Sequence, residues 1–332
     1  MAEYKIRFAE TMDIPNIMRF IDTYWKKNHI LATDKDLFEW QYIHNNNKVN
    51  MVVGLDEEDE LQAILGYIPY SDGTQKDISL ALWKAKPGTA FLGVKLLMYL
   101  LNEEPHRHVF CNGINVRTTA GIYHRLGIKT DKLSQWYRLR AVDEFKIAEV
   151  TSNQIPQTEI HSDYQLIKVE NFADLENSST ERMFDISAVP YKSKEYINKR
   201  YFKHPVYKYL VYCIKSHGTN ADAAIVFRIQ SCNKSSALRL IDFIGDNNIL
   251  YKITSQIDQI ADENHVEYVD MYEHGLDDEM LSKSGWRKVG DDDNIIPNYF
   301  APYEKCNVDI NISTSDETIV LFKGDGDQDR PN

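Results

Sequence analysis

Two polar side chains on one face of a short apolar segment are the first residues that could do chemistry. From 77 to 83 the residues alternate, which predicts a strand whose even-numbered positions are apolar and face the core. Asp77 and Ser79 then share the opposite face with Ala81 and Trp83. Asp77 is our candidate base and Ser79 a candidate polariser or proton relay. A strand-end aspartate that caps a turn is an equally good interpretation, and both stay open.

A glycine-bearing turn and a helix follow this strand. Pro87 and Gly88 end the strand, and the apolar spacing from Ala90 to Leu101 predicts an amphipathic helix with Gly93 in its first turns. A helix that starts in this way points unpaired N–H groups outward at the positive end of its dipole. This order suits a phosphate-bearing cofactor, although any ordinary α/β unit can show it.

The residues after the helix make the pattern more specific. Residues 108–114 predict another buried strand, which leads to Asn115 and to a short helix with Tyr123 that closes at Leu126, Gly127 and Ile128. This order resembles the GNAT superfamily of acyl-CoA N-acyltransferases over about residues 3–140. The resemblance implies an α/β (α+β) fold, with a mixed, mostly antiparallel sheet flanked by helices, and acetyl-CoA or another acyl-CoA as co-substrate.

The resemblance also assigns roles to residues. Tyr123 would protonate the leaving thiolate, and the pantetheine arm of coenzyme A would pair with main chain near residues 82–84. The family's turn has a basic residue where this chain has Ala85, so one register uses Gly88 and Ala90 while another uses Phe91 and Gly93. Lys84, Lys86 and Lys95 could supply the missing charge. The expected cofactor contacts are Leu82, Trp83, Lys84, Gly88, Thr89, Ala90, Gly93, Val94 and Asn115.

Composition narrows the class of partner. The 332 residues carry a net charge of −12, and the segment from Ala261 to the end, with 18 acidic and 6 basic residues, accounts for all of it. An acidic surface at one end repels phosphates, so we expect neither nucleic acid nor a membrane as partner. The four cysteines show no CxxC spacing. There is no apolar run of 18 residues and no signal-peptide pattern, so we expect a cytoplasmic protein.

The periodicities along the chain predict two lobes. Residues 1–150 would be the acyl-CoA-binding catalytic lobe, and residues 151–332 a second, degenerate GNAT-like lobe that binds the acceptor. The polar segment 150–163 would link them. Acidic residues flank the second lobe's turn at Gly245, which argues against a second cofactor site there. The expected strands are 6–8, 50–54, 61–67, 166–169, 209–214, 223–229, 237–244, 266–272 and 318–322, and the expected helices include 14–27, 174–184 and 249–263.

Several residues outside the cofactor turn are candidates for the acceptor site. His29 would belong to one wall of the acceptor cleft, as the family implies, or would be structural. Arg200, Tyr201 and His204 lie in KRYFKHPVY, which could hold a base and a diphosphate or could be a solvated loop.

The carboxyl-terminal KGDGDQDRPN resembles the ends of acyltransferases encoded for bacterial surface polysaccharides. We expect it to fold back so that Asp327 and Arg330 reach the acceptor, although such a tail is usually disordered. Its alternating aspartates lack the rest of a calcium loop, so we expect no metal.

The predicted reaction is N-acyl transfer from acyl-CoA to a nucleotide-linked amino sugar, in surface polysaccharide or O-antigen biosynthesis, by direct attack in a ternary complex. One alternative is a Fem-like transferase that acts on a peptide or lipid-linked precursor. Another is a GNAT-like scaffold that binds without catalysis, since the pyrophosphate turn departs from the family's pattern. The sequence does not reveal the acyl chain, the sugar, the nucleotide or the oligomeric state.

Overall fold

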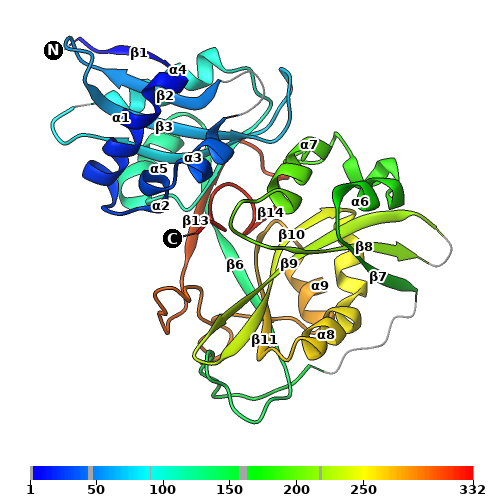
Figure 1. Ribbon diagram of the computed structural model, residues 1–332. Coiled ribbons are helices and arrows are strands. Elements are labelled where there is room, and N and C mark those ends of the chain that lie inside the picture. Colours follow the sequence, from blue (N-terminus) through cyan, green and yellow to red (C-terminus); the bar gives the residue numbers. More distant parts are fainter. Residues whose placement is uncertain (1–2, 44–47, 90, 157–162, 217–218, 332) are drawn as a thin grey trace.

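The computed structural model describes residues 3–43, 48–89, 91–156, 163–216 and 219–331. Its strands join into one 14-stranded, mostly antiparallel sheet flanked by helices, which confirms the predicted α/β (α+β) class (Figure 1). The strands are β1 (Lys5–Ala9), β2 (Val49–Leu55), β3 (Leu61–Pro69), β4 (Ile78–Ala85), β5 (Val109–Asn112), β6 (Lys129–Leu139), β7 (Tyr164–Val169), β8 (Leu210–Ser216), β9 (Ala221–Cys232), β10 (Ser235–Gly245), β11 (Tyr268–His274), β12 (Arg287–Lys288), β13 (Ile310–Thr314) and β14 (Leu321–Phe322).

The helices cover both faces of the sheet. They are η1 (Thr11–Asp13), α1 (Ile14–Phe20), η2 (Ile21–Trp25), α2 (Ile30–Thr33), α3 (Lys35–Tyr42), α4 (Leu92–Glu103), α5 (Val116–Arg125), α6 (Phe172–Ser178), η3 (Glu181–Phe184), α7 (Lys194–Ile197), η4 (Asn198–Phe202), η5 (Asn247–Lys252), α8 (Thr254–Glu263) and α9 (Asp278–Lys283).

Alternation along β2 separates two layers of helices in the amino-terminal half. Met51 and Val53 pack on one face with side chains of α1, α2 and α3. Val52 points to the other face and packs with Leu92 and Leu96 of α4. Because successive strand residues face opposite sides, a single apolar strand supports both layers.

A strand from the end of the chain joins the two halves of the sheet. β13 pairs antiparallel with β5 on one side and with the first part of β6 on the other. The rest of β6 pairs with β11 of the second half. The division at residue 150 stays a prediction. Strands on the two sides of it nevertheless pair with each other, β6 with β11 and β13 with both β5 and β6.

A hydrophobic cluster on one face of the sheet also spans both halves. Tyr70 and Phe110 of the first half pack in it with Tyr196 and Val211 of the second. The rings of Tyr70 and Tyr196 are stacked with their centroids 4.2 Å apart. The two halves are therefore joined by apolar packing as well as by strand pairing.

Most predicted elements are present, with shifted ends. The helix predicted over 14–27 is an α-helix only to Phe20 and continues as the π-helical turn η2. The helix predicted over 249–263 begins as the 3₁₀ segment η5. The strand predicted over 318–322 pairs only at Leu321–Phe322. The link predicted over 150–163 lies partly outside the described residues.

The carboxyl-terminal tail is buried between the halves, where Figure 1 shows it in red. Asp325 is fully buried and accepts hydrogen bonds from Lys192 Nζ at 2.9 Å and from the Tyr70 hydroxyl at 3.1 Å. Asp329 pairs with Arg228 and accepts a hydrogen bond from the Tyr209 hydroxyl at 2.9 Å. Asp325 and Asp329, the outer two of the three alternating aspartates in the tail, therefore anchor the tail to the rest of the protein.

The charges around these anchors are balanced. Burial would raise the pKa of Asp329, but the Arg228 guanidinium outweighs burial and holds this pKa at about 2. Burial would lower the pKa of Lys192, but Asp242 and Asp325 outweigh it and raise this pKa. A buried cation shared by two carboxylates stays charged for the same reason.

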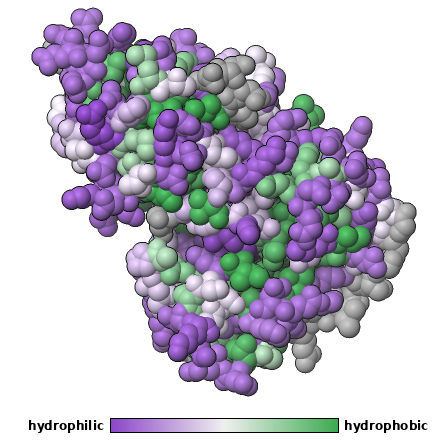
Figure 2. All heavy atoms as spheres, viewed as in Figure 1, coloured by the Kyte–Doolittle hydropathy of each residue, from purple (hydrophilic) through white to green (hydrophobic). Residues whose placement is uncertain are grey.

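None of the helices among the described residues is long and apolar enough to cross a bilayer. Hydrophilic residues cover most of the face shown in Figure 2, and hydrophobic residues appear there in small groups. No three potential metal-ligating side chains lie together in the described part of the chain.

Loss of the Lys192 amino group should destabilise the protein strongly. Its Nζ lies 2.6 Å from Asp242 and 2.9 Å from Asp325, and both carboxylates are fully buried. Lys192→Met would leave both uncompensated, so we expect a loss of about 3–5 kcal/mol in the free energy of unfolding. Urea denaturation measures it. Lys194→Met, which removes an exposed pair with Glu176, should cost less than about 1 kcal/mol. Equal costs for the two variants would contradict this account of the anchor.

Candidate active site

The site begins where two parallel strands diverge. β4 and β5 pair only at Ile78 with Val109 and at Ser79 with Phe110. Beyond that point the pairing of β4 with β3 slips by one residue, and Leu82 takes a positive φ of 35°. The extra residue is a β-bulge, which bends β4 and aims its main chain away from the sheet.

A cleft of about 720 Å³ lies in the opening between these strands. Residues 80–85 of β4 form one wall, and Cys111, Asn112 and the start of α5 form the other. The predicted Leu82, Trp83 and Lys84 line it, as do Gly93, Val94 and Asn115. Asn115 also caps α5, because its side chain accepts a hydrogen bond from the N–H of Arg117 at 3.1 Å.

The start of α4 closes one end of the cleft. Phe91 precedes the helix with φ of 61°, and Phe91, Gly93 and Val94 line the cleft. Gly88 and Thr89 do not line it, and Ala90 lies outside the described residues. Of the two registers that the sequence left open, the one through Phe91 and Gly93 faces the cleft.

Close packing explains the glycine at position 93. The Trp83 indole donates a hydrogen bond to the Gly93 carbonyl at 3.2 Å. A Cβ at position 93 would lie 3.0 Å from the same indole nitrogen. Trp83 is thus held against the first turn of α4, where N–H groups have no partner within the helix.

The charge of the cleft favours an anion. Among the described residues that line it, Lys84, Arg125 and Arg330 are basic, and Asp327 is the only acid. Arg125, on the last turn of α5, was not predicted as a site residue, because a basic residue in the last turn also stabilises a helix by itself.

Tyr123, to which the resemblance assigns the role of proton donor, lines the cleft. It is buried, and its ring lies 6.0 Å from that of Trp83. Burial raises its pKa, and the neighbouring Cys111 thiol adds to the effect. Burial also raises the pKa of Cys111, so this thiol stays protonated and is no nucleophile.

The structure does not bring Asp77 to the cleft. Its carboxylate is fully buried, pairs with both Nε and Nη2 of Arg107, and accepts the N–H of Tyr191 at 2.6 Å. The geometry therefore argues against Asp77 as the base and favours the other interpretation, a structural carboxylate.

Ser79 and the tail are in close contact. Ser79 is fully buried, and its hydroxyl lies 2.7 Å from the place where a Cβ on Gly326 would stand. Gly326 has φ of +65°, so a side chain would be strained there as well as crowded. Ser79 supports the tail beside the cleft rather than lining it.

The tail brings the predicted Asp327 and Arg330 into the site. They pair with each other, and both line the cleft. The Arg330 guanidinium also lies 5.3 Å from the centre of the Trp25 ring. His29 is buried beside that ring, and its Nδ1 accepts the N–H of Leu31, which makes it the cap of α2. His29 does not line the cleft.

The predicted residues of the segment 199–207 have different roles. Arg200 is buried and donates to the main-chain carbonyl groups of Gly324 and Asp329. The Tyr201 hydroxyl donates to Asp242 at 2.6 Å. His204 Nδ1 accepts two backbone N–H groups, and burial lowers its pKa to about 3. These three side chains are thus packed against the protein, while Lys203, Pro205 and Val206 of the same segment are exposed.

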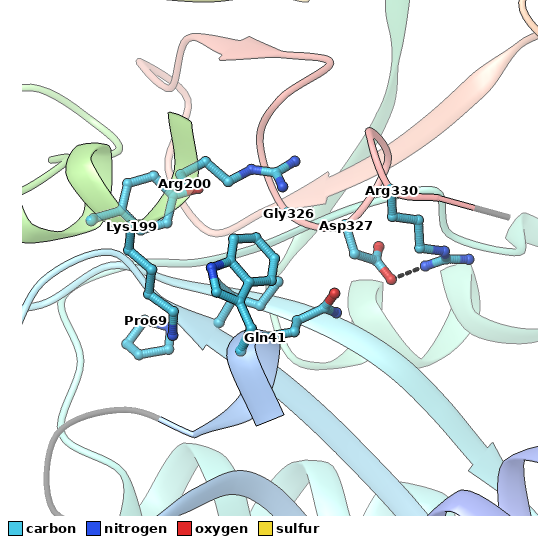
Figure 3. Close-up of a pocket in the computed structure, with 10 residues that line it drawn as sticks. Gln41, Pro69, Lys199, Arg200, Gly326, Asp327 and Arg330 are labelled. Atoms are coloured by element: carbon cyan, nitrogen blue, oxygen red, sulfur yellow. Dashed lines mark hydrogen bonds and ion pairs between the residues drawn. The ribbon is translucent and has the colours of Figure 1, made fainter. Parts of the chain in front are cut away.

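A second, smaller cavity adjoins the cleft. Its volume is about 30 Å³, and Figure 3 shows Gln41 entering from α3 and Lys199 and Arg200 from η4. Asp327 and Arg330 line both cavities. Trp40 lines it too, whereas Phe38 and Tyr42 are buried in the core.

Comparison with solved structures identifies the fold. A GCN5-related N-acetyltransferase from Anabaena variabilis matches 94% of this chain and 72% of its own, with 11% identity and a TM-score of 0.56. A probable N-acyltransferase from Enterococcus faecalis matches 93% and 72%, with 8% identity and a TM-score of 0.58. The chain has the fold of the GCN5-related N-acetyltransferases. No family model and no curated protein matches the sequence.

Another structure with the GCN5-related fold is a glucosamine N-acetyltransferase region of a fungal multi-domain β-N-acetylglucosaminidase. It covers 95% of this chain and 38% of its own, with 9% identity and a TM-score of 0.54. At these identities the comparisons confirm the fold that the resemblance implied. The tandem arrangement and the sugar-nucleotide subfamily stay proposals.

Protonation of His29 should make stability depend on pH. Burial, with Arg330 and Lys26 adding, lowers its pKa from 6.5 to about 4. Because the unfolded chain binds the proton first, His29 stabilises the fold above pH 6.5, and this stability is lost as pH falls toward 4. The urea midpoint should therefore fall from pH 7 to pH 5, and fall less in His29→Asn, which keeps a capping acceptor.

The exposed His265 provides the control for this pH effect. His265→Asn should keep the full decline of the parent protein between pH 7 and pH 5. A decline in His29→Asn as steep as that of the parent would show that His29 is not responsible.

Proposed function

We propose that this protein transfers an acyl group from acyl-CoA to an amine. The observation that carries the proposal is the cleft itself. A bulged β4 diverges from β5 directly opposite the first turn of α4, and the lining is basic except for Asp327. Helix N–H groups with basic side chains suit a pyrophosphate, and the exposed main chain of β4 suits the amides of pantetheine.

Lys84 and Arg125 stand on the two walls of this cleft and would hold the phosphates. The thioester would then lie beside residues 81–83, which line the cleft and whose main-chain N–H groups could face it. Such groups polarise a thioester carbonyl and stabilise the oxyanion that forms on attack.

Asp327 is the better candidate for the base. Among the described residues lining either cavity it is the only carboxylate, and it lies where the two cavities meet. The acceptor nitrogen would bond to the carbonyl carbon as the carbon–sulfur bond breaks, while Asp327 takes the amine proton, directly or through water. The adjacent Arg330 keeps Asp327 in place.

Tyr123 would stabilise the leaving thiolate. Its raised pKa keeps the hydroxyl protonated, so Tyr123 can donate a hydrogen bond to the sulfur. The same raised pKa makes complete transfer of the proton less favourable than the family role implies. A proton from solvent would then complete the free thiol.

A nucleotide-linked amino sugar, as in surface polysaccharide synthesis, is the acceptor that we propose. The carboxyl-terminal resemblance supports it, and the GCN5-related fold holds a glucosamine acceptor in at least one protein. In this proposal the second half of the chain shapes the acceptor site, and residues of η4 and the tail contact the acceptor. A Fem-like acceptor and a scaffold without catalysis remain outcomes that experiment can separate.

Calorimetry with acetyl-CoA tests the cleft. We expect saturable binding, about tenfold weaker in Gly93→Ala, because the new Cβ would displace the Trp83 indole from the first turn of α4. Gly121→Ala is the matched control, since a Cβ there meets nothing within 4 Å. Thiol release with amino-sugar nucleotides, but not with peptide amines, would then select the proposed acceptor. Absence of binding, or binding without thiol release for any amine, would favour the scaffold.

Asp327→Asn tests the base. With an amine that supports thiol release, we expect kcat to fall about 10²–10⁴-fold while the acetyl-CoA dissociation constant changes little. The residual rate should rise with pH as more of the amine becomes free. Asp309→Asn, which alters an exposed carboxylate, should keep the parent rate. A folded Asp77→Asn variant that alone lost kcat would restore Asp77 as the base.

A further inference from the structure

The small cavity beside the cleft has an unusual lining. Lys199 and Arg200 enter it from η4, and neither forms an ion pair with any carboxylate of the described residues. Lys199 donates only to the main-chain carbonyl of Ile43, at 3.0 Å. Asp327, the one acid in the lining, is already paired with Arg330. The cavity therefore carries an excess of positive charge.

Three further polar side chains line the cavity, those of Trp40, Gln41 and Tyr196. The indole nitrogen of Trp40 is buried and has no hydrogen-bond partner among the described residues. The side-chain amide of Gln41 faces the same space in Figure 3. A buried N–H group without a partner costs free energy, so such groups are normally paired in the functional state.

Burial lowers the pKa of Lys199 to about 8. An amino group in this condition has lost its hydration without gaining a counter-charge. An anion placed beside it would restore that interaction, and the N–H of Trp40 would gain an acceptor at the same time.

The size of the cavity limits what can enter. Its volume of about 30 Å³ exceeds the roughly 10–15 Å³ that one water molecule needs, so a small group such as a carboxylate can enter. The cleft, at about 720 Å³, is the larger space and suits a diphosphate better. The cavity also meets the cleft at Asp327, so a group bound here belongs to a molecule whose amine reaches the thioester.

We propose that this cavity binds a carboxylate group of the acceptor, with Lys199 and Arg200 as its cations and the indole N–H of Trp40 as a donor. The inference rests on the proposed function and narrows it. The acceptor carries a carboxylate near the amine that is acylated, and any nucleotide diphosphate lies outside this cavity.

Acetate is the probe, and the indole N–H of Trp40 is the reporter. The chain has five tryptophans, so a ¹⁵N-tryptophan-labelled sample gives five indole signals, with Trp40 assigned from Trp40→Phe. We expect acetate to shift the Trp40 signal with a dissociation constant on the order of 1 mM, and inorganic phosphate to bind more weakly. Lys199→Met should weaken acetate about tenfold or more, and Lys203→Met, at an exposed site, should not.

The other four indole signals report whether Lys199→Met is folded. No saturable shift with acetate, a stronger response to phosphate, or a response unchanged in folded Lys199→Met would each overturn the inference. Calorimetry with acetyl-CoA on the same samples keeps the two proposals apart. If the protein binds acetyl-CoA but not acetate, only the proposed carboxylate site is wrong. If it binds acetate but not acetyl-CoA, the proposed acyltransferase function is wrong.

Discussion

The buried charge cluster around Lys192 is the interaction on which the site depends. Lys192 joins Asp242 of β10 to Asp325 of the tail, with all three groups removed from water. Charges in such a place are stable only when each has its partner. The cluster therefore fixes the tail between the halves, and Arg228 fixes it again at Asp329. Only because both ends are held can Asp327, between them, be presented to the cavities.

A second constraint is the bulge at Leu82. If β4 and β5 continued to pair beyond Ser79, their main-chain groups would satisfy one another and the sheet would close. Beyond the bulge β4 stays paired with β3 up to Ala85 but not with β5, and β2 stays paired with β3. The opening is thus confined to one edge of β4, while its other edge stays paired with β3.

The sequence predicted those strands and helices that a local residue pattern determines. The strand from Ile78, the helix from Leu92 and the short helix with Tyr123 follow from alternation and helical spacing, and each stands where the resemblance implied. The insertion of β13 between β5 and β6 was not predictable in this way, because its pairing partners lie about 170 to 200 residues away in sequence. The ion pair of Asp77 was not predictable for a similar reason, since its partner Arg107 comes from a loop that carried no signal.

The positions of the acidic residues near the carboxyl terminus also could not be predicted from their number in the sequence. The 18 acidic residues from Ala261 onward suggest an acidic surface, yet Glu267, Asp270, Glu273, Asp325, Asp327 and Asp329 are buried. Asp270 pairs with Arg239 at 3.2 Å, and Glu267 accepts main-chain N–H groups of residues 146–148. Burial raises the pKa of Glu273 to about 7, so even its charge is partial near neutral pH. A third of these acidic residues therefore lie in the interior, and the acidic surface of this segment is smaller than their number indicates. An anion at the cleft therefore meets mainly the basic residues that line it rather than the acidic residues of this segment.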